Sequence, residues 1–353
     1  MPEATDRTLL KKSSPPRAFS LLSARAREKR RGGWEVVRGI ARRHLNLFVS
    51  LEKKVLQGED PKAIHDFRVA SRRLQQALDL LYPKPRSKKV RKLRDVIRRS
   101  RGTFSEARNC DVLLERVDRY LAQKRSGQRE TPRETWISFR EFLEKRRAEA
   151  FRASVGKLIR MNLSDFYVRL RDSLSSPPQA VEGSLSGNGA EAEASPEGEP
   201  FESRLIRELQ TTWDHFEAQV QHSQNEGETN SLHPVRIAAK QLRYLVELMV
   251  QLHVPGSQKV VSRLKRLQQH LGNWHDLEVM EEMMAEMLSR PKFLRGHIDL
   301  AIRIEKLMLR NRKDKGIYQK KYFAVAFQTG GCSEMKAWVN DFTTSAPPAG
   351  AET

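Results

Sequence analysis

Residues 65–81 read HDFRVASRRLQQALDLL, and residues 233–249 read HPVRIAAKQLRYLVELM. The two stretches align without a gap. Corresponding positions include His65 and His233, Arg68 and Arg236, Val69 and Ile237, Ala70 and Ala238, and Arg72 and Lys240. A repeat of this kind indicates a duplicated structural unit, here two copies of one basic segment. We therefore expect two related helices that face a shared site.

Each copy is predicted to form a helix with an apolar back and a cationic front. At about 100° per residue, the basic side chains of each copy fall within one stripe. The front residues are His65, Arg68, Arg72 and Gln75 in the first copy and His233, Arg236, Lys240 and Arg243 in the second. The back residues are Phe67, Ala70, Leu74, Leu78 and Leu81 in the first copy and Val235, Ala238, Leu242, Val246 and Met249 in the second. Asp60 followed by Pro61 is typical of a helix start.

The two cationic fronts differ from an ordinary solvent-facing helix surface. Such surfaces mix both signs of charge and gain from acid–base pairs four residues apart. Here the front positions carry no acid, so like charges repel and the arrangement costs stability. A bound polyanion would remove that cost, which favours a binding role over a merely solvated face.

Composition supports a polyanionic partner. The 353 residues include 65 Lys and Arg against 44 Asp and Glu, which gives a formal net charge of +21. A third basic stripe follows the first copy and contains Arg91, Arg94, Arg98 and Arg101. Such an excess favours nucleic acid, acidic membrane surfaces or polymeric phosphate as partners. Arginine is preferred where a phosphate is held by two parallel hydrogen bonds.

The pattern along the chain predicts an all-α protein, because no convincing strand alternation occurs. The predicted helices cover residues 34–57, 61–82, 87–105, 107–125, 132–161, 163–175, 201–222, 232–252, 257–271, 275–289, 292–312 and 314–328. We divide the chain into a disordered basic arm (1–33), a first helical half (34–176), an acidic linker rich in Gly, Ser and Pro (177–200), a second half (201–343) and a disordered tail (344–353). Each half holds one copy of the repeat.

A further pairing follows the basic helices. FSEARNCDV at 104–112 aligns with LGNWHDLEV at 271–279. Gly272 is expected to end one helix. Asn109 and Asp276 are expected to cap the helices that follow.

Cysteine content and hydropathy bear on the compartment. Only Cys110 and Cys332 occur, which fits a reducing environment and gives no disulfide framework or thiolate metal site. The sequence contains no run of 18 apolar residues, so we expect no membrane span. We expect a cytoplasmic protein.

The chain resembles the CHAD family, which is named for a histidine-bearing α-helical domain. The resemblance rests on LQGEDPKAIHDFRVASRRL (56–74), LHPVRIAAKQLRYLVEL (232–248) and LKRLQQHLGNWHDLEV (264–279) and covers roughly residues 34 to 343. It implies two helical bundles, related by a pseudo-twofold axis, around a central basic groove. It also implies binding of inorganic polyphosphate, often with recruitment to polyphosphate granules, and no catalysis by the domain itself.

The site implied by the resemblance is carried over position by position. It comprises His65, Arg68, Arg72 and Arg73 in the first half, His233, Arg236, Lys240, Arg243 and Tyr244 in the second, and Lys265 in the third block. We add Arg94 and Arg98 from the third basic stripe. Gln75 and Gln241 stand where the family usually has a basic residue, and Asn109 replaces an expected Asp, so binding is expected to be weaker there.

Two alternatives remain open. Non-specific nucleic-acid binding fits the charge, although aromatic residues make up 7% of the chain and do not interleave with the basic stripes. A metal-dependent phosphohydrolase is suggested by the His-Asp dipeptides at 65–66 and 275–276, but a metal site needs three or more converging ligands. We expect no catalytic residues, no cofactor and no metal ligands; protein partners stay open.

Overall fold

The computed structural model describes residues 32–58, 60–82, 87–122, 132–175, 200–225, 232–328 and 330–344, and these contain helices and no strand. The all-α prediction is therefore confirmed. The predicted arm, acidic linker and tail lie almost entirely outside the described residues. Gly32 and Gly33, assigned to the arm, instead begin the first described helix.

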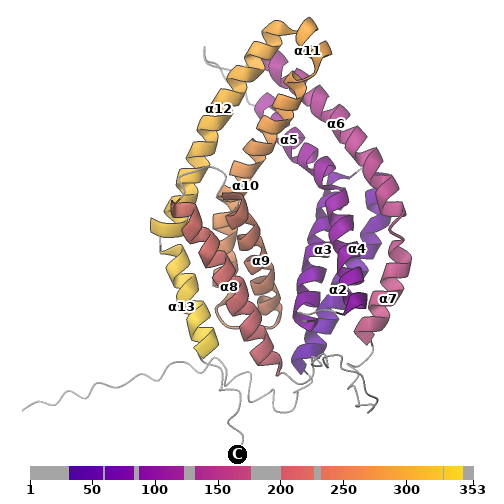
Figure 1. The fold of residues 1–353 in the computed structure, drawn as a ribbon, viewed down its shortest axis with the longest axis vertical. Helices are drawn as coiled ribbons and strands as arrows, with labels where there is room; N and C mark the ends of the chain where they lie inside the picture. Colours follow the sequence, from indigo (N-terminus) through magenta and orange to yellow (C-terminus); the bar gives the residue numbers. More distant parts are fainter. Residues whose placement is uncertain are drawn as a thin grey trace, which may run out of the picture.

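The helices form two halves that meet at one end of the molecule (Figure 1). The first half contains α2 (Gly32–Gln57), α3 (Pro61–Leu81), α4 (Lys88–Thr103), α5 (Ser105–Ala122), α6 (Arg133–Ile159) and α7 (Leu163–Ser175). The second contains α8 (Phe201–Asn225), α9 (Leu232–Gln251), α10 (Ser257–Leu288), α11 (Pro291–Gly296), α12 (Ile298–Phe323), a π-helical turn (Ala324–Gln328) and α13 (Gly331–Thr344). The predicted pseudo-twofold relation between the halves stays a prediction.

Helix α3 begins where its sequence indicates. The Asp60 side chain accepts a hydrogen bond from the Lys62 amide at 2.8 Å, and Pro61 occupies the first helical position. The predicted apolar back is fully buried, as shown by Phe67 and Leu74 at 0% exposure. Because the back is fixed in the core, the cationic front must point to the other side of the helix.

The prediction that a helix ends at Gly272 was wrong. The helix runs unbroken for 32 residues, and Gly272 lies inside it. Glycine costs about 1 kcal/mol in a helix interior, but Leu271 and Trp274 on either side are buried, and this packing outweighs the cost. Asp276 therefore does not cap a helix, and its carboxylate acts on the charge of Arg236 in α9.

Asn109 also lies within a helix instead of capping one. The chain turns at Phe104, and α5 starts at Ser105. Phe104 is fully buried and fixes the turn between α4 and α5. Helix α5 therefore starts at Ser105, before the predicted capping position at Asn109.

Two apolar cores hold the halves together. The larger core draws on α2, α3, α4 and α7 of the first half and on α8, α9 and α10 of the second. The smaller core, at the end where the halves meet, combines Phe139 and Leu143 of α6 with Met280 of α10 and Ile304 of α12. Helix α10 contributes to both cores. Its middle, around Asp276, therefore lies between them.

No described helix is both long and apolar enough to cross a membrane.

Candidate functional site

The two helices that carry the sequence repeat pack side by side. Nη1 of Arg72 in α3 donates a hydrogen bond to the Tyr244 hydroxyl of α9 at 3.2 Å. Nε and Nη2 of Arg73 donate to Oε2 of Glu247 at 3.3 and 3.2 Å. The cationic fronts of α3 and α9 thus meet across the boundary between the halves.

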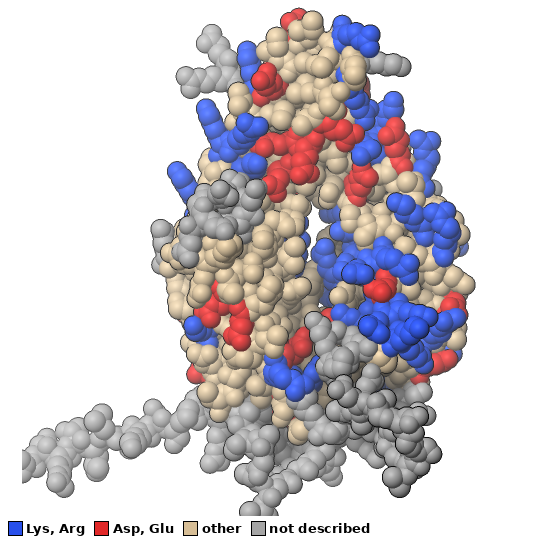
Figure 2. All heavy atoms as spheres, in the orientation of Figure 1, with Lys and Arg blue, Asp and Glu red and all other residues tan. Residues whose placement is uncertain are grey.

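A group of basic side chains, called the cationic cluster below, gathers at this boundary. It consists of Arg68 and Arg72 of α3, Arg101 of α4, Arg108 of α5, and Arg236, Lys240 and Arg243 of α9. All of these side chains are half-buried. The molecular surface is hollowed between the two halves, and Lys and Arg side chains gather on the side formed by α3 and α4 (Figure 2). We call this hollow the groove.

Lys240 occupies the most repulsive position in the cationic cluster. Burial, together with the charges of Arg236, Arg72, Arg68 and Arg243, lowers its pKa to about 6. In the free protein at neutral pH this amine is therefore largely uncharged. The sequence places Lys240 on the cationic front of its helix, but it does not reveal how many arginines surround this side chain and lower its pKa.

The half-buried Arg68 and Arg236 are destabilised in a similar way but keep their charge. Burial, and then Arg72 and Arg101, lower the pKa of Arg68 to about 10. Burial, opposed by Asp276 and reinforced by Arg72, lowers that of Arg236 to about 10. The Nε atoms of Arg236 and Arg243 are buried and make no hydrogen bond to described residues. Unmade donors of this kind are costly, and an anion in the groove would reduce the repulsion.

Other contacts hold the cationic cluster in place. Arg68 donates to the backbone carbonyl of Arg101 and, at 2.8 Å, to the Ser105 hydroxyl. Arg101 donates in turn to Oε1 of Gln75 at 2.8 Å. Gln75, a departure from the family pattern, thus orients a guanidinium instead of supplying a charge.

Arg101 and Arg108 were not among the predicted site residues. Arg101 belongs to the third basic stripe, and its phase with Arg94 and Arg98 was the signal available. Arg108 lies in α5, and its charge lowers the pKa values of His65 and Arg68. No motif marks it, because only the packing of α5 against α3 brings it near.

Tyr244 lies beneath the arginines and is 6% exposed. The guanidinium carbon of Arg243 lies 4.9 Å from its ring centre, and that of Arg72 lies 5.9 Å away. Burial alone would raise the pKa of Tyr244, but the charges of Arg72 and Arg243 lower it. The buried tyrosine therefore positions the guanidinium groups of Arg72 and Arg243.

Acidic residues from neighbouring positions partly offset the positive charge. Glu247 accepts from Arg73 and lies 3.7 Å from Nε of Arg243. Asp276 of α10 raises the pKa of Arg236. Burial raises the pKa of Asp276, although His275 and Arg236 oppose that shift. The predicted stripes contain no acid, yet the fold supplies acids beside them.

Both predicted histidines are exposed, near the starts of their helices. Burial and then Arg108 lower the pKa of His65, while Asp66 opposes the change. Burial, His275 and Arg236 lower the pKa of His233. At neutral pH each imidazole is therefore protonated less often than an unperturbed histidine.

Besides Arg73, Tyr244 and the two histidines, three more predicted site residues lie outside the cationic cluster. Arg94 forms an ion pair with Asp79, and Arg98 forms one with Asp95 at 2.9 Å. Both still contribute to lowering the pKa of Arg101. Lys265 is exposed on α10, and no contact among the described residues joins it to the cationic cluster.

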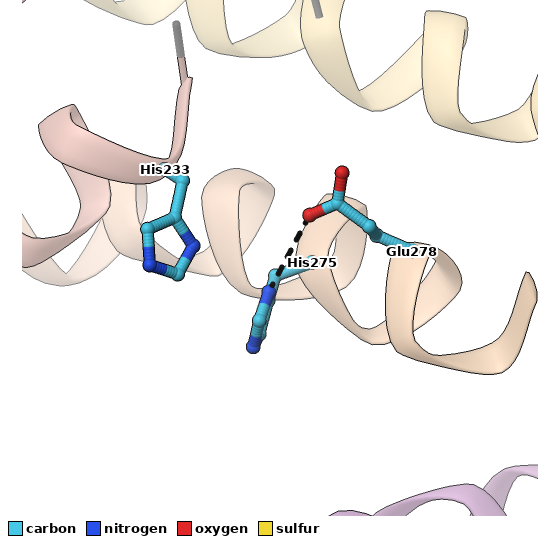
Figure 3. A group of neighbouring side chains, drawn as sticks. All are labelled: His233, His275 and Glu278. Atoms are coloured by element: carbon cyan, nitrogen blue, oxygen red, sulfur yellow. Dashed lines mark ion pairs between the residues drawn. The ribbon is translucent and has the colours of Figure 1, made fainter. Parts of the chain in front are cut away.

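The start of α9 also brings His233 close to His275 and Glu278 of α10 (Figure 3). No metal ligands were predicted from the sequence, and this group is not among the predicted site residues. The available signal was the spacing of three between His275 and Glu278, which puts both on one helix face. The third member comes from another helix, so only the fold completes the set.

Comparisons with known proteins agree with this architecture. A family model described as the CHAD domain matches residues 39–285, most of the chain. A crystal structure of the CHAD domain from the plant Ricinus communis aligns with a TM-score of 0.58 at 18% identity, covering 85% of this chain and 91% of that one. PptA from Streptomyces chartreusis aligns with a TM-score of 0.53 at 15% identity, covering 83% and 98%. At these identities the two structures show a common fold. No relative is found among curated proteins.

Proposed function

Because the chain belongs to the CHAD-domain family, we propose that it binds inorganic polyphosphate in the groove between α3 and α9. The family is linked to polyphosphate binding in general. The proposal is one of binding without turnover. We also propose that the protein is recruited to polyphosphate granules in the cytoplasm, because a protein that binds the polymer is held where the polymer accumulates.

The observation that carries the proposal is the convergence of cations from both halves on Lys240. Burial and the charges of four arginines lower its pKa to about 6. Polyphosphate is a flexible chain with a negative charge on each unit, so successive units can follow Arg68, Arg72 and Arg236 and restore the charge of Lys240. Charge-assisted hydrogen bonds from guanidinium groups to phosphate oxygens are among the strongest in proteins.

Polyphosphate suits the groove better than nucleic acid does. Single-stranded nucleic acids gain affinity by stacking bases on exposed aromatic side chains. Among the described residues, Tyr244 is the aromatic side chain that lies against arginines of the cationic cluster, and it is buried beneath two of them. A polymer that needs cations and no stacking surface fits this chemistry.

The test is a competition titration at about 150 mM salt, where weak surface attraction is screened. Labelled long-chain polyphosphate is bound to the full chain and then challenged with single- and double-stranded nucleic acid. The same titration is run on an Arg72→Gln/Arg236→Gln variant. An Arg152→Gln/Arg169→Gln variant, altered at exposed arginines of α6 and α7, is the control because it loses the same charge.

We expect retention of polyphosphate against nucleic acid, at least about 10-fold weaker binding in the Arg72/Arg236 variant, and little change in the control, because lost charge-assisted hydrogen bonds cost about 1.5–3 kcal/mol each. Displacement by nucleic acid at equal phosphate concentration would favour a general polyanion binder. Equal losses in both variants would move the site away from α3 and α9.

A further inference from the structure

One side of α12 presents large aliphatic side chains to solvent. Ile298, Ile302 and Leu309 are 67%, 46% and 51% exposed. At about 100° per residue, these three residues lie within about 40° of one another around the helix. The opposite side of α12 is fixed in the protein, because Ile304 and Leu307 are buried in the smaller apolar core. The row of Ile298, Ile302 and Leu309, called the apolar stripe below, therefore faces away from the protein.

Lysine side chains lie beside the apolar stripe. Lys306, Lys313 and Lys320 are exposed and make no ion pair with a described residue. Around the helix they lie about 40° to 80° from Ile298, on one flank of the stripe. Along its 26 residues α12 contains eight Lys and Arg against three Asp and Glu, of which Glu305 borders the stripe. The outward side of α12 therefore combines apolar surface with excess positive charge.

Helix α12 forms the outer edge of the second half, and α11 lies at the tip of the molecule (Figure 1). Basic side chains stand out along the same edge in the space-filling view (Figure 2). Leu294 of α11 adds an aliphatic side chain that is 43% exposed. The groove is lined by α3 and α9, whereas α12 packs on α10. A flat partner can therefore reach α12 without entering the groove.

We propose that the outward side of α12 docks on a membrane surface of anionic lipids, with the helix lying along that surface. Helices of this kind insert aliphatic side chains at the boundary between headgroups and acyl chains, and their basic residues are attracted to the lipid phosphates. Lysine suits this position because its apolar stem can lie against the acyl chains while its ammonium group reaches the headgroups. Charge and apolar surface are then both satisfied by one partner.

Other occupants match only part of this surface. A second copy of the chain would bring Lys306, Lys313 and Lys320 of both copies together, and each copy already carries a formal net charge of +21. A protein partner is favoured by aromatic residues and arginine, whereas lysine is depleted from protein interfaces. A soluble polyanion would pair with the lysines but leave the apolar stripe in water. An anionic lipid surface complements both features.

Vesicle sedimentation tests the proposal on the full chain at about 150 mM salt. One set of vesicles contains equal parts of phosphatidylcholine and phosphatidylglycerol, and the other contains phosphatidylcholine alone. Two variants remove either the aliphatic side chains or the charges of α12: Ile298→Ser/Ile302→Ser/Leu309→Ser and Lys306→Gln/Lys313→Gln/Lys320→Gln. Two controls make the same changes at exposed positions of α2, α6 and α7: Val36→Ser/Leu47→Ser/Val168→Ser and Lys53→Gln/Lys145→Gln/Lys157→Gln. Circular dichroism verifies that each variant folds.

We expect wild type to sediment with the anionic vesicles and to bind the neutral vesicles about 10-fold or more weakly, because lysines near an anionic surface each add to binding. Both α12 variants should bind the anionic vesicles about 10-fold or more weakly than wild type, since apolar insertion and charge act together. Both controls should match wild type.

Failure of wild type to sediment with anionic vesicles would overturn the proposal, as would an equal loss of binding in either control. The Arg72→Gln/Arg236→Gln variant is run alongside, because a loss of vesicle binding there would move the contact to the groove. A wild-type dimer in analytical ultracentrifugation that the Ile298/Ile302/Leu309 variant loses would make a second copy the occupant instead of a membrane. The assay contains no polyphosphate, so membrane docking and polyphosphate binding fail separately.

Discussion

The guanidinium of Arg72 donates a hydrogen bond to the hydroxyl of Tyr244 at 3.2 Å, although 172 positions separate them in the sequence. This bond joins the two copies of the repeat, because Arg72 belongs to α3 and Tyr244 to α9. The Tyr244 ring also supports Arg243 from the same helix. One buried hydroxyl and its ring thereby fix the positions of two cations that face the groove.

Tyr244→Phe should separate the hydrogen bond from the ring contact. We expect the free energy of unfolding to fall by about 1 kcal/mol, since Nη1 of Arg72 loses its acceptor while the ring remains. Polyphosphate affinity should fall only severalfold. Chemical denaturation and the polyphosphate titration measure the two effects. Tyr167→Phe is the control, because Arg171 lies 5.6 Å over that ring in the same way. Equal destabilisation in both variants would contradict the role given to the hydroxyl.

Lys240 should make polyphosphate binding take up protons. Its pKa is about 6 in the free protein, and a bound polyanion raises it, so near pH 7 the amine gains a proton from the buffer. Calorimetry in buffers of different ionisation enthalpy measures this uptake. Lys240→Met should reduce it and weaken binding. The histidines add to the uptake only at lower pH, because their pKa values are lowered too. Equal proton uptake in wild type and Lys240→Met would show that Lys240 is not the group that gains the proton.

The same lysine should shape the pH dependence of stability. Its pKa is lowered from 10.5 to about 6, so between these values the unfolded chain binds more protons than the folded one. Stability of the free protein should therefore rise with pH across this window. Denaturation midpoints at a series of pH values measure the slope. Lys240→Met should flatten it, and a slope that is unchanged in this variant would assign the dependence to other groups.

Glu247→Gln should strengthen polyphosphate binding. The carboxylate offsets the charge of Arg73 and Arg243, and its neutral replacement leaves both guanidinium groups to the ligand. We expect severalfold tighter binding and a salt dependence steeper by about one counterion. Glu334→Gln, which releases Arg263 on α10, is the matched control. Weaker binding in Glu247→Gln would mean that the acid positions the arginines more than it opposes the ligand.

Gly272→Ala should stabilise the protein by up to about 1 kcal/mol, because alanine is the better helix former. Apart from its chain neighbours and the backbone of its own helix, no described atom lies within 4 Å of the position that its Cβ would occupy. Gly256→Ala should do the opposite, since this residue has φ of +79° and its Cβ would meet the Trp338 ring at 2.6 Å. Thermal unfolding measures both changes. Destabilisation by Gly272→Ala would contradict this expectation. It would show that the middle of α10 requires a glycine, as it would if the helix were broken there.

Much of the fold was readable from local patterns. Helix α3 starts at Pro61 after Asp60 and buries the predicted back, because capping and a period of 3.6 are properties of neighbouring residues. The predictions that used a local signal against long-range packing were wrong. Gly272 and Asn109 lie inside helices, since buried neighbours from other segments decide where a helix continues.

The sequence by itself determined that the chain is all-α, which face of each repeated helix is cationic, and to which family the chain belongs. These depend on residue type and on spacing along one helix. The tertiary structure alone decided that Arg108 joins the cationic cluster, that Lys240 loses its charge, and that His233 meets His275. Electrostatic energies depend on distance through space and on burial, and a linear pattern contains neither.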